Sequence, residues 1–325
     1  MTTPVPTPAG TVSKPLTLGE SFMCGGLAGC AAVTISNVPE TMKTRLQLQG
    51  ELVRQDANAP RVYKNVFDVF AKTYKNEGIR GLQRGLIPAY GYQILLNGSR
   101  LGFYEPVRKI FNRAIGRPAL EQVFSTSVAA GATTGVIGAT LGSPLFLVKA
   151  RIQAYSPALP VGAQHNYKGS YDALSTILRT DGFLGLWRGV STAMLRTAMG
   201  SSVQLPSYNY GKTVLVKNGM QADSFWTFLT ASSVSACAVC AVMQPADTAL
   251  TRVYNQPTMK DPKTGAIRGT LYSGAIDCLW QTFKTEGIKG WYKGTTAHFL
   301  RIAPHTIVTL VANEIIMTQY KKIRG

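Results

Sequence analysis

Residues 142–153 read GSPLFLVKARIQ, an apolar stretch that reaches Pro144 and becomes basic within two helical turns. Two other stretches follow the same order of residue types, NVPETMKTRLQ at 37–47 and QPADTALTRVY at 244–254. When the copies are aligned on the arginine that each contains, they lie 106 and 101 residues apart. A period of that length indicates a repeat of domain size, so the three stretches decide how the rest of the chain is interpreted.

Two further landmarks recur with nearly the same period. A tyrosine opens a turn after each stretch, and the three copies are Tyr63, Tyr167 and Tyr272. An acid followed by glycine then opens a block that ends in a base and glycine, NEGIRGLQRG, TDGFLGLWRG and TEGIKGWYKG. We therefore divide the chain into three repeats, 18–117, 118–219 and 220–325. The Pro/Thr-rich residues 1–17 precede them, and we expect that segment to be disordered.

The composition indicates a membrane protein. Only 15% of residues are charged, and uncharged runs at 21–39, 122–148 and 224–246 are long enough to span a bilayer. A second spanning helix is expected after the base–glycine pair of each repeat. A short amphipathic helix, too short to span, lies between the two. The sequence thus predicts an all-α membrane protein with six transmembrane helices around a pseudo-threefold axis, three short surface helices, and both termini on one side.

Several classes of function are excluded. The net charge is +18, but the basic residues flank or interrupt apolar runs, so they indicate positive loops and an anion site, and no nucleic-acid surface is expected. Cys237 and Cys240 form a CxxC inside an uncharged run, where packing is the simpler interpretation. No nucleophile–base pair, phosphate loop or metal-spaced cluster is found. We expect no enzyme, no metal and no cofactor.

These features resemble the mitochondrial carrier family over essentially the whole chain. The tripled P-x-[DE]-x-x-[KR]-x-[KR] pattern and the tripled acid–glycine block carry the resemblance. It implies a multi-pass protein of the inner mitochondrial membrane with both termini in the intermembrane space. The surface helices would then lie on the matrix side. One departure is that Pro39 stands one residue later than the family pattern, which would put the proline at position 38.

The resemblance implies that the acid of one repeat pairs with the base of the next. At the matrix end, this "matrix gate" pairs Glu40 with Lys149 and Asp247 with Lys43, and leaves Phe146 with Leu250, with Gln47 as a hydrogen-bonding brace. A "cytoplasmic gate" at the other end pairs Glu105 with Lys212 and Glu314 with Arg108, and leaves Asn209 with Met317. In each gate the missing acid and the missing base fall in one pair, which supports the rule, because a lone buried charge is costly. The alternative is that these charges only anchor helix ends at the interface.

The resemblance also implies contact points for substrate on the second helix of each repeat. They are Tyr92–Gln93, Arg196–Thr197 and Arg301–Ile302. Arg100 lies two turns beyond Tyr92 on the same face, and His305 one turn beyond Arg301. Arginines that face one cavity with little counter-charge suit a compact dianion. His305 is either a substrate or proton contact or a packing residue.

Glycines and bases at helix starts resemble the cardiolipin sites of the family, with simple helix capping as the alternative. These residues are Arg84, Gly85, Gly169, Arg188, Gly189, Gly274, Lys293 and Gly294. We therefore expect a monomer whose partners are a small anion, cardiolipin and the membrane. The expected function is secondary transport of small dicarboxylates or oxoacids by alternating access, with oxaloacetate first and malonate, sulfate, thiosulfate or isopropylmalate as further candidates. The alternatives are an exchanger of a different anion and a non-transporting scaffold or receptor on the same fold.

Overall fold

The computed structural model describes residues 17–52, 61–119, 121, 123–221, 224–260 and 267–324. Residues 1–16, most of the segment expected to be disordered, lie outside that description, as do a few side chains within helices, that of Glu314 among them. Thr17 is described. It caps the first helix by accepting a hydrogen bond from the Glu20 amide, while Glu20 accepts one from the Thr17 amide.

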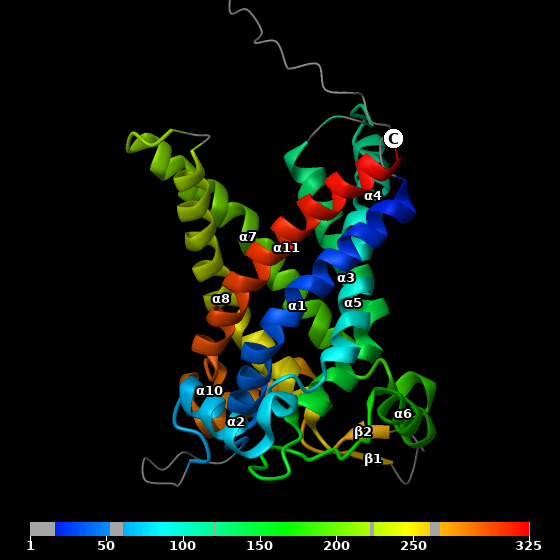
Figure 1. Cartoon of the computed structure of the whole chain (residues 1–325), viewed down its shortest axis with the longest axis vertical. Coiled ribbons are helices and arrows are strands. Elements are labelled where there is room, and N and C mark those ends of the chain that lie inside the picture. The colour runs from blue at the N-terminus through cyan, green and yellow to red at the C-terminus, as the bar shows by residue number, and fades with distance from the viewer. Residues whose placement is uncertain are drawn as a thin grey trace, which may run out of the picture.

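Six long helices form a closed ring (Figure 1). They are α1 (Leu18–Leu48), α3 (Leu86–Gly102), α5 (Phe124–Ala154), α7 (Val190–Lys217), α8 (Phe225–Asn255) and α11 (Thr295–Arg324). Each helix of this list contacts the next, and α11 returns to α1. The helix α4 (Tyr104–Ala114) continues the direction of α3 after a turn at Phe103. The structure is thus all-α, as the sequence predicted.

The shorter elements gather at one end of the ring (Figure 1). They are the surface helices α2 (Val66–Leu82), α6 (Ser170–Gly185) and α9 (Ala275–Glu286), the single turn α10 (Ile288–Trp291), and the antiparallel strands β1 (Thr258–Lys260) and β2 (Ile267–Gly269). The small hairpin was not predicted. At the opposite end of Figure 1, α7 and α8 spread away from α4, and α1 begins near the end of α11.

Four segments within the described residues are long and apolar enough to cross a membrane by length and composition alone: Leu18–Leu48, Phe124–Ala154, Leu229–Asn255 and Ile288–Tyr320. The helices α3 and α7 are not among them. α3 has 17 residues and includes Arg100, and α7 includes Arg196 and Lys212. Both helices nevertheless contact a neighbouring helix on each side in the ring. We attribute their polarity to the face that they turn toward the centre, because a helix that lines a wet cavity needs only one apolar face.

The arginines and acids that served only as repeat landmarks pair within each repeat. In the first repeat, Arg45 Nη1 lies 2.7 Å from Glu77 Oε1, and both side chains are buried. Burial raises the pKa of the Glu77 carboxyl, but hydrogen bonds from Arg45 and Ser156 outweigh it and hold that pKa below its ordinary value. The equivalent nitrogen–oxygen distances are 3.9 Å for Arg151–Asp181 and 2.6 Å for Arg252–Glu286. This pair ties the surface helix of a repeat to its first long helix.

A donor from the same repeat binds a carbonyl near the proline of each first long helix, and in repeats 2 and 3 this is the carbonyl that the proline leaves without a helical partner. Pro144 has no amide hydrogen, so the carbonyl of Thr140 lacks its helical partner. The indole nitrogen Nε1 of Trp187 donates to that carbonyl at 2.9 Å. The equivalent bonds run from Tyr292 Oη to the Ala241 carbonyl at 3.2 Å, and from Gln83 Nε2 to the Thr34 carbonyl at 3.0 Å. Thr34 is the repeat equivalent of Thr140, so the contact keeps its position although Pro39 has shifted by one residue.

The base–glycine turns pack against the next repeat. Gly189 starts α7 with φ of 78°, and a Cβ atom there would lie 2.5 Å from the ring of Tyr254. Gly85 meets Gln153 in the same way, and Gly294 meets Gln47. The three contacts run from repeat 1 to 2, from 2 to 3 and from 3 to 1, so they close the ring at this end.

We expect Gly189→Ala to destabilise the protein by more than about 1–2 kcal/mol, the cost of a left-handed backbone, because the methyl group also collides with Tyr254. Thermal unfolding of the detergent-solubilised protein measures the effect. Gly169→Ala is the matched control, since Gly169 has an extended φ of 179° and open space around it. Equal unfolding temperatures for the two variants would contradict this account.

Candidate functional site: a charged central cavity

Two buried ion pairs cross the ring at the end with the surface helices. Lys43 Nζ on α1 lies 2.6 Å from Asp247 Oδ2 on α8. Lys149 Nζ on α5 lies 2.6 Å from Glu40 Oε2 on α1. These are the two pairs that the sequence predicted for the matrix gate, and they join α1 to both other proline-containing helices of the gate.

Gln47 contacts the first of these pairs. Its Nε2 donates to Asp247 Oδ2 at 3.0 Å, and its Oε1 accepts from Thr251 at 2.7 Å. The equivalent Gln153 donates to Asn37 instead, at 3.0 Å, and contacts no carboxylate. The two glutamines therefore differ as the sequence indicated, with only Gln47 hydrogen-bonded to an ionic link.

The third position of the matrix gate is aromatic. Phe146 lies between Tyr92 and Tyr254, with ring centroids 4.9 and 5.5 Å away. Leu250 is buried in the apolar cluster against which Phe146 packs. Tyr254, at the position equivalent to Gln47, pairs its hydroxyl with Ser143 at 2.9 Å. The apolar contact expected between Phe146 and Leu250 is thus part of a larger cluster that also includes Tyr254.

Asp247 has a further partner that connects the gate to the cavity. Arg196 Nε on α7 lies 2.7 Å from Asp247 Oδ1. One carboxylate therefore binds Lys43 and Gln47 through Oδ2 and Arg196 through Oδ1. The sequence placed Arg196 in the substrate site and Asp247 in the gate, and it gave no indication that the two are bonded.

Arg301 has a neutral partner and no carboxylate among the described residues. Its Nη2 lies 3.4 Å from His298 Nε2, and its buried Nε has no partner. Since arginine only donates, His298 Nε2 must accept, and the proton of the ring is then on Nδ1. Nδ1 lies 2.6 Å from Gln244 Oε1, and Gln244 Nε2 donates to the Lys293 carbonyl at 2.7 Å. The guanidinium of Arg301 therefore has no ion-pair partner among the described residues.

The other predicted contact residues lie around these arginines. Tyr92 and Gln93 are buried on α3, and Gln93 Nε2 approaches His305 Nε2 at 3.5 Å. His305 also contacts Ser36, with 3.0 Å between Nδ1 and Oγ. The hydroxyl of Thr197 donates to the Ala193 carbonyl of its own helix, at 2.9 Å. Ile302 is half-buried on α11.

The whole chain matches one family. The family model described as mitochondrial carrier protein matches residues 14–114, 121–219 and 221–324, one match for each repeat. The chain belongs to the mitochondrial carrier family. Members of this family are transporters and not enzymes, so the chain is a multi-pass transport protein of the inner mitochondrial membrane.

Three similar carriers cover most of the chain. The mitochondrial oxaloacetate transport protein of Saccharomyces cerevisiae is 48% identical over 94% of this chain and 91% of its own length. The mitochondrial citrate transporter E of Aspergillus niger is 50% identical, over 89% of this chain and 90% of its own length. Human solute carrier family 25 member 35 is 41% identical, with 89% and 94% covered.

The opposite end of this carrier does not have the cross-repeat pair predicted for Glu105. Arg108 Nη2 donates to both oxygens of Glu105, three residues earlier on α4, at 2.8 and 3.0 Å, and its Nη1 donates to the Glu121 carbonyl. The predicted pair of Glu105 with Lys212 is not formed in this structure, and it stays a prediction. The side chain of Glu314 lies outside the described residues, so its predicted pair with Arg108 cannot be located. The spread of α7 and α8 away from α4 explains the difference, because it leaves each charge to its local partners (Figure 1).

The remaining pair predicted at this end has also not formed in the expected way. Met317 Sδ accepts a weak hydrogen bond from Asn313 Nδ2 on its own helix, at 3.6 Å. Asn209 and Lys212 line a separate cavity of about 370 Å³ on α7.

The bases of the expected lipid sites are bonded inside the protein. Arg84 lies 2.9 Å from Glu77, Arg188 lies 2.8 Å from Asp181, and Lys293 contacts Glu286. Each acid of an acid–glycine block thus binds two bases. The helices that begin after Gly85 and Gly189 have no side-chain cap, and neither do those after Gly169 and Gly274. Their backbone amides are consistent with either capping by solvent or an anionic lipid head group.

Sequence reasoning missed the relay from Gln244 through His298 to Arg301. His298 is fully buried, and the same position in the other repeats is Ala89 or Ala193. A buried histidine that replaces alanine in only one copy of a repeat is the signal that could have identified it.

We expect His298→Ala to lower the free energy of unfolding by about 1–3 kcal/mol, because Gln244 Oε1 then loses its buried partner. Thermal unfolding in detergent measures this effect. His165→Ala serves as the control, since His165 lies at a more exposed position outside the spanning helices, where it contacts the Asn255 carbonyl. An unfolding temperature for His298→Ala equal to that of the native protein would rule out a structural relay.

Proposed function

We propose that the protein carries small dicarboxylate and oxoacid anions across the inner mitochondrial membrane by alternating access, with oxaloacetate as its main substrate. The main support is the pair Arg196 and Arg301, which occupy equivalent positions in repeats 2 and 3, 105 residues apart. Arg301 has no carboxylate partner among the described residues, so it offers a guanidinium to which an anion can bind.

The names of similar carriers support the same class of substrate. The relatives from Saccharomyces cerevisiae and Schizosaccharomyces pombe, 48% and 47% identical to this chain, are both called oxaloacetate transport proteins. Malonate, sulfate, thiosulfate and isopropylmalate carry the same compact negative charge and are further candidates. Citrate is the second candidate, because the relative from Aspergillus niger is called a citrate transporter. A non-transporting scaffold would not require arginines at both of these equivalent positions, whereas an anion carrier would.

The proposed mechanism begins with competition for Arg196. An anion that binds Arg301 and Arg196 displaces Asp247 Oδ1 from Arg196, and this weakens the hold of α7 on the matrix gate. The remaining links are Asp247–Lys43 and Glu40–Lys149, and the Phe146 position contributes no ion pair. Substrate binding energy then has two ionic links to break instead of three. Closure of the opposite end would bring Glu105, Arg108 and Lys212 into the pairs expected from the sequence.

Three further features belong to this proposal. The uncapped helix starts after Gly85 and Gly189 would bind cardiolipin head groups through backbone amides. The carrier would act as a monomer, because its cavity is enclosed by one ring of helices. Both termini would face the intermembrane space, on the side to which the cavity opens.

Uptake of labelled oxaloacetate, malonate, sulfate and citrate into liposomes containing the purified protein tests the function. We expect uptake of the dicarboxylates, and its loss by at least about tenfold in Arg196→Ala and in Arg301→Ala. Arg179→Ala, which removes an exposed arginine from α6, should transport normally. A native protein that takes up none of these anions would refute the proposal.

Charge reversal of the two gate pairs is expected to give different results. The double variant Glu40→Lys with Lys149→Glu recreates the ion pair, in which neither partner is in direct contact with an arginine, and it should retain uptake. The double variant Lys43→Asp with Asp247→Lys places a lysine against Arg196, and it should lose at least about tenfold in rate. Equal uptake by the two double variants would show that the contact between Arg196 and Asp247 does not matter for transport.

A further inference from the structure

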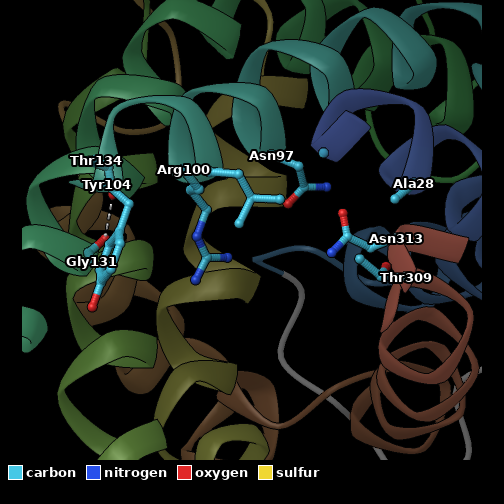
Figure 2. Close-up of a pocket in the computed structure, with 10 residues that line it drawn as sticks. Ala28, Asn97, Arg100, Tyr104, Gly131, Thr134, Thr309 and Asn313 are labelled. Atoms are coloured by element: carbon cyan, nitrogen blue, oxygen red, sulfur yellow. Dashed lines mark hydrogen bonds between the residues drawn. The ribbon is translucent and has the colours of Figure 1, made fainter. Parts of the chain in front are cut away.

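A cavity of about 340 Å³ is lined by residues of α1, α3, α4, α5 and α11 (Figure 2). Small residues of α1 and α5, among them Ala28 and Gly131, form part of its wall. Polar side chains of α3 and α11, including Asn97, Arg100 and Asn313, form another part. In Figure 2, Arg100 extends from α3 into this space, and Thr309 and Asn313 face it from α11.

The cavity is distinct from the site built on Arg196 and Arg301. None of its lining residues is Tyr92, Arg196 or Arg301. Arg100 lies eight residues beyond Tyr92 on α3, which corresponds to about 12 Å along a helix. Thr309 lies eight residues beyond Arg301 on α11, so the repeat places Arg100 and Thr309 in a second ring of equivalent positions. The backbone positions of the two levels are thus separated by about two helical turns.

Two groups of this cavity lack a partner among the described residues. Arg100 makes no hydrogen bond or ion pair there, in contrast to Arg196, whose charge is matched by Asp247. Asn313 Oδ1 is buried and accepts no hydrogen bond, and Asn313 Nδ2 has only the weak contact with Met317. An unpaired guanidinium in a cavity that also holds the weakly bonded Nδ2 donor of Asn313 is suited to a carboxylate or a small oxoanion, because both groups donate hydrogen bonds.

We propose that this cavity is a second anion-binding subsite, in which Arg100 holds one carboxylate of an entering substrate before the substrate reaches Arg196 and Arg301. The inference rests on the proposed function, and it separates Arg100 from the central site. One arginine binds more weakly than two, so the anion passes from Arg100 to the deeper pair along a gradient of positive charge. Arg100 would then govern how readily substrate is captured and not how fast the gates exchange.

Space in this subsite depends on Gly131. A Cβ atom at Gly131 would meet nothing within 4 Å, and its backbone does not require glycine. A larger side chain at that position can therefore leave the backbone without an immediate collision and occupy part of the cavity that Gly131 lines. This gives a variant that fills the subsite and leaves every charge of the protein in place.

The test is concentration-dependent uptake of labelled malonate by reconstituted protein. Arg100→Gln should raise KM about tenfold, the loss of one charge-assisted hydrogen bond, with kcat within roughly twofold of the native value. Gly131→Leu should raise KM in the same way, and Arg100→Lys should recover much of the native KM. Arg113→Gln, which removes the same charge from an exposed position on α4, is the matched control and should behave as the native protein does.

Each other outcome overturns a stated part of the interpretation. An unchanged KM in Arg100→Gln, with native uptake intact, overturns the second subsite alone. A fall in kcat as large as that in Arg196→Ala would put Arg100 in the central site. Absence of uptake by the native protein overturns the proposed function, and the subsite with it. Thermal unfolding of each variant verifies that it is folded.

Discussion

The carboxylate of Asp247 is the contact on which the arrangement of the cavity depends. Its two oxygens bind different helices, Lys43 of α1 through Oδ2 and Arg196 of α7 through Oδ1. A buried carboxylate needs such partners, because an uncompensated charge in a low-dielectric interior is costly. The same atom group therefore closes one end of the ring and neutralises one of the two central arginines. An anion that binds Arg196 in place of Asp247 would therefore weaken a contact of the gate and change the charge near the proposed substrate site at the same time.

Contacts that occur in all three repeats hold the helices together, whereas several residues near the proposed binding sites occur in one repeat only. In each repeat an arginine–acid pair joins the surface helix to the first long helix. A glycine of each repeat also packs against the residue of the next repeat that occupies the position of Gln47, Gln153 or Tyr254. These contacts occur in all three copies. By contrast, Phe146, His298 and Arg100 each occur in one copy only, and all three lie at the gate or in the cavities. A single asymmetric anion has no use for a threefold-symmetric site, which explains why the symmetry fails where substrate would bind.

The sequence predicted the fold well, because long apolar runs and a tripled motif constrain it strongly. The uncharged run at residues 21–39 predicted a spanning helix and lies within α1, and the pairs Lys43–Asp247 and Glu40–Lys149 lie in contact. The pair predicted between Glu105 and Lys212 is not formed in this structure, where Glu105 binds Arg108 of its own helix instead, and it stays a prediction. The bond between Arg196 and Asp247 and the relay through His298 were missed. Both depend on how far helices of different repeats lie from one another, which repeat spacing does not contain.

The aromatic column of Tyr92, Phe146 and Tyr254 has a thermal consequence. Apolar contacts weaken on cooling because their stabilisation comes with a large heat-capacity change, whereas an ion pair does not follow that temperature dependence. On cooling, the aromatic contact of this gate therefore weakens relative to its two ion pairs. The weakest side of the gate is then the one between α5 and α8. Which side of the ring opens first would then depend on the temperature at which the carrier works.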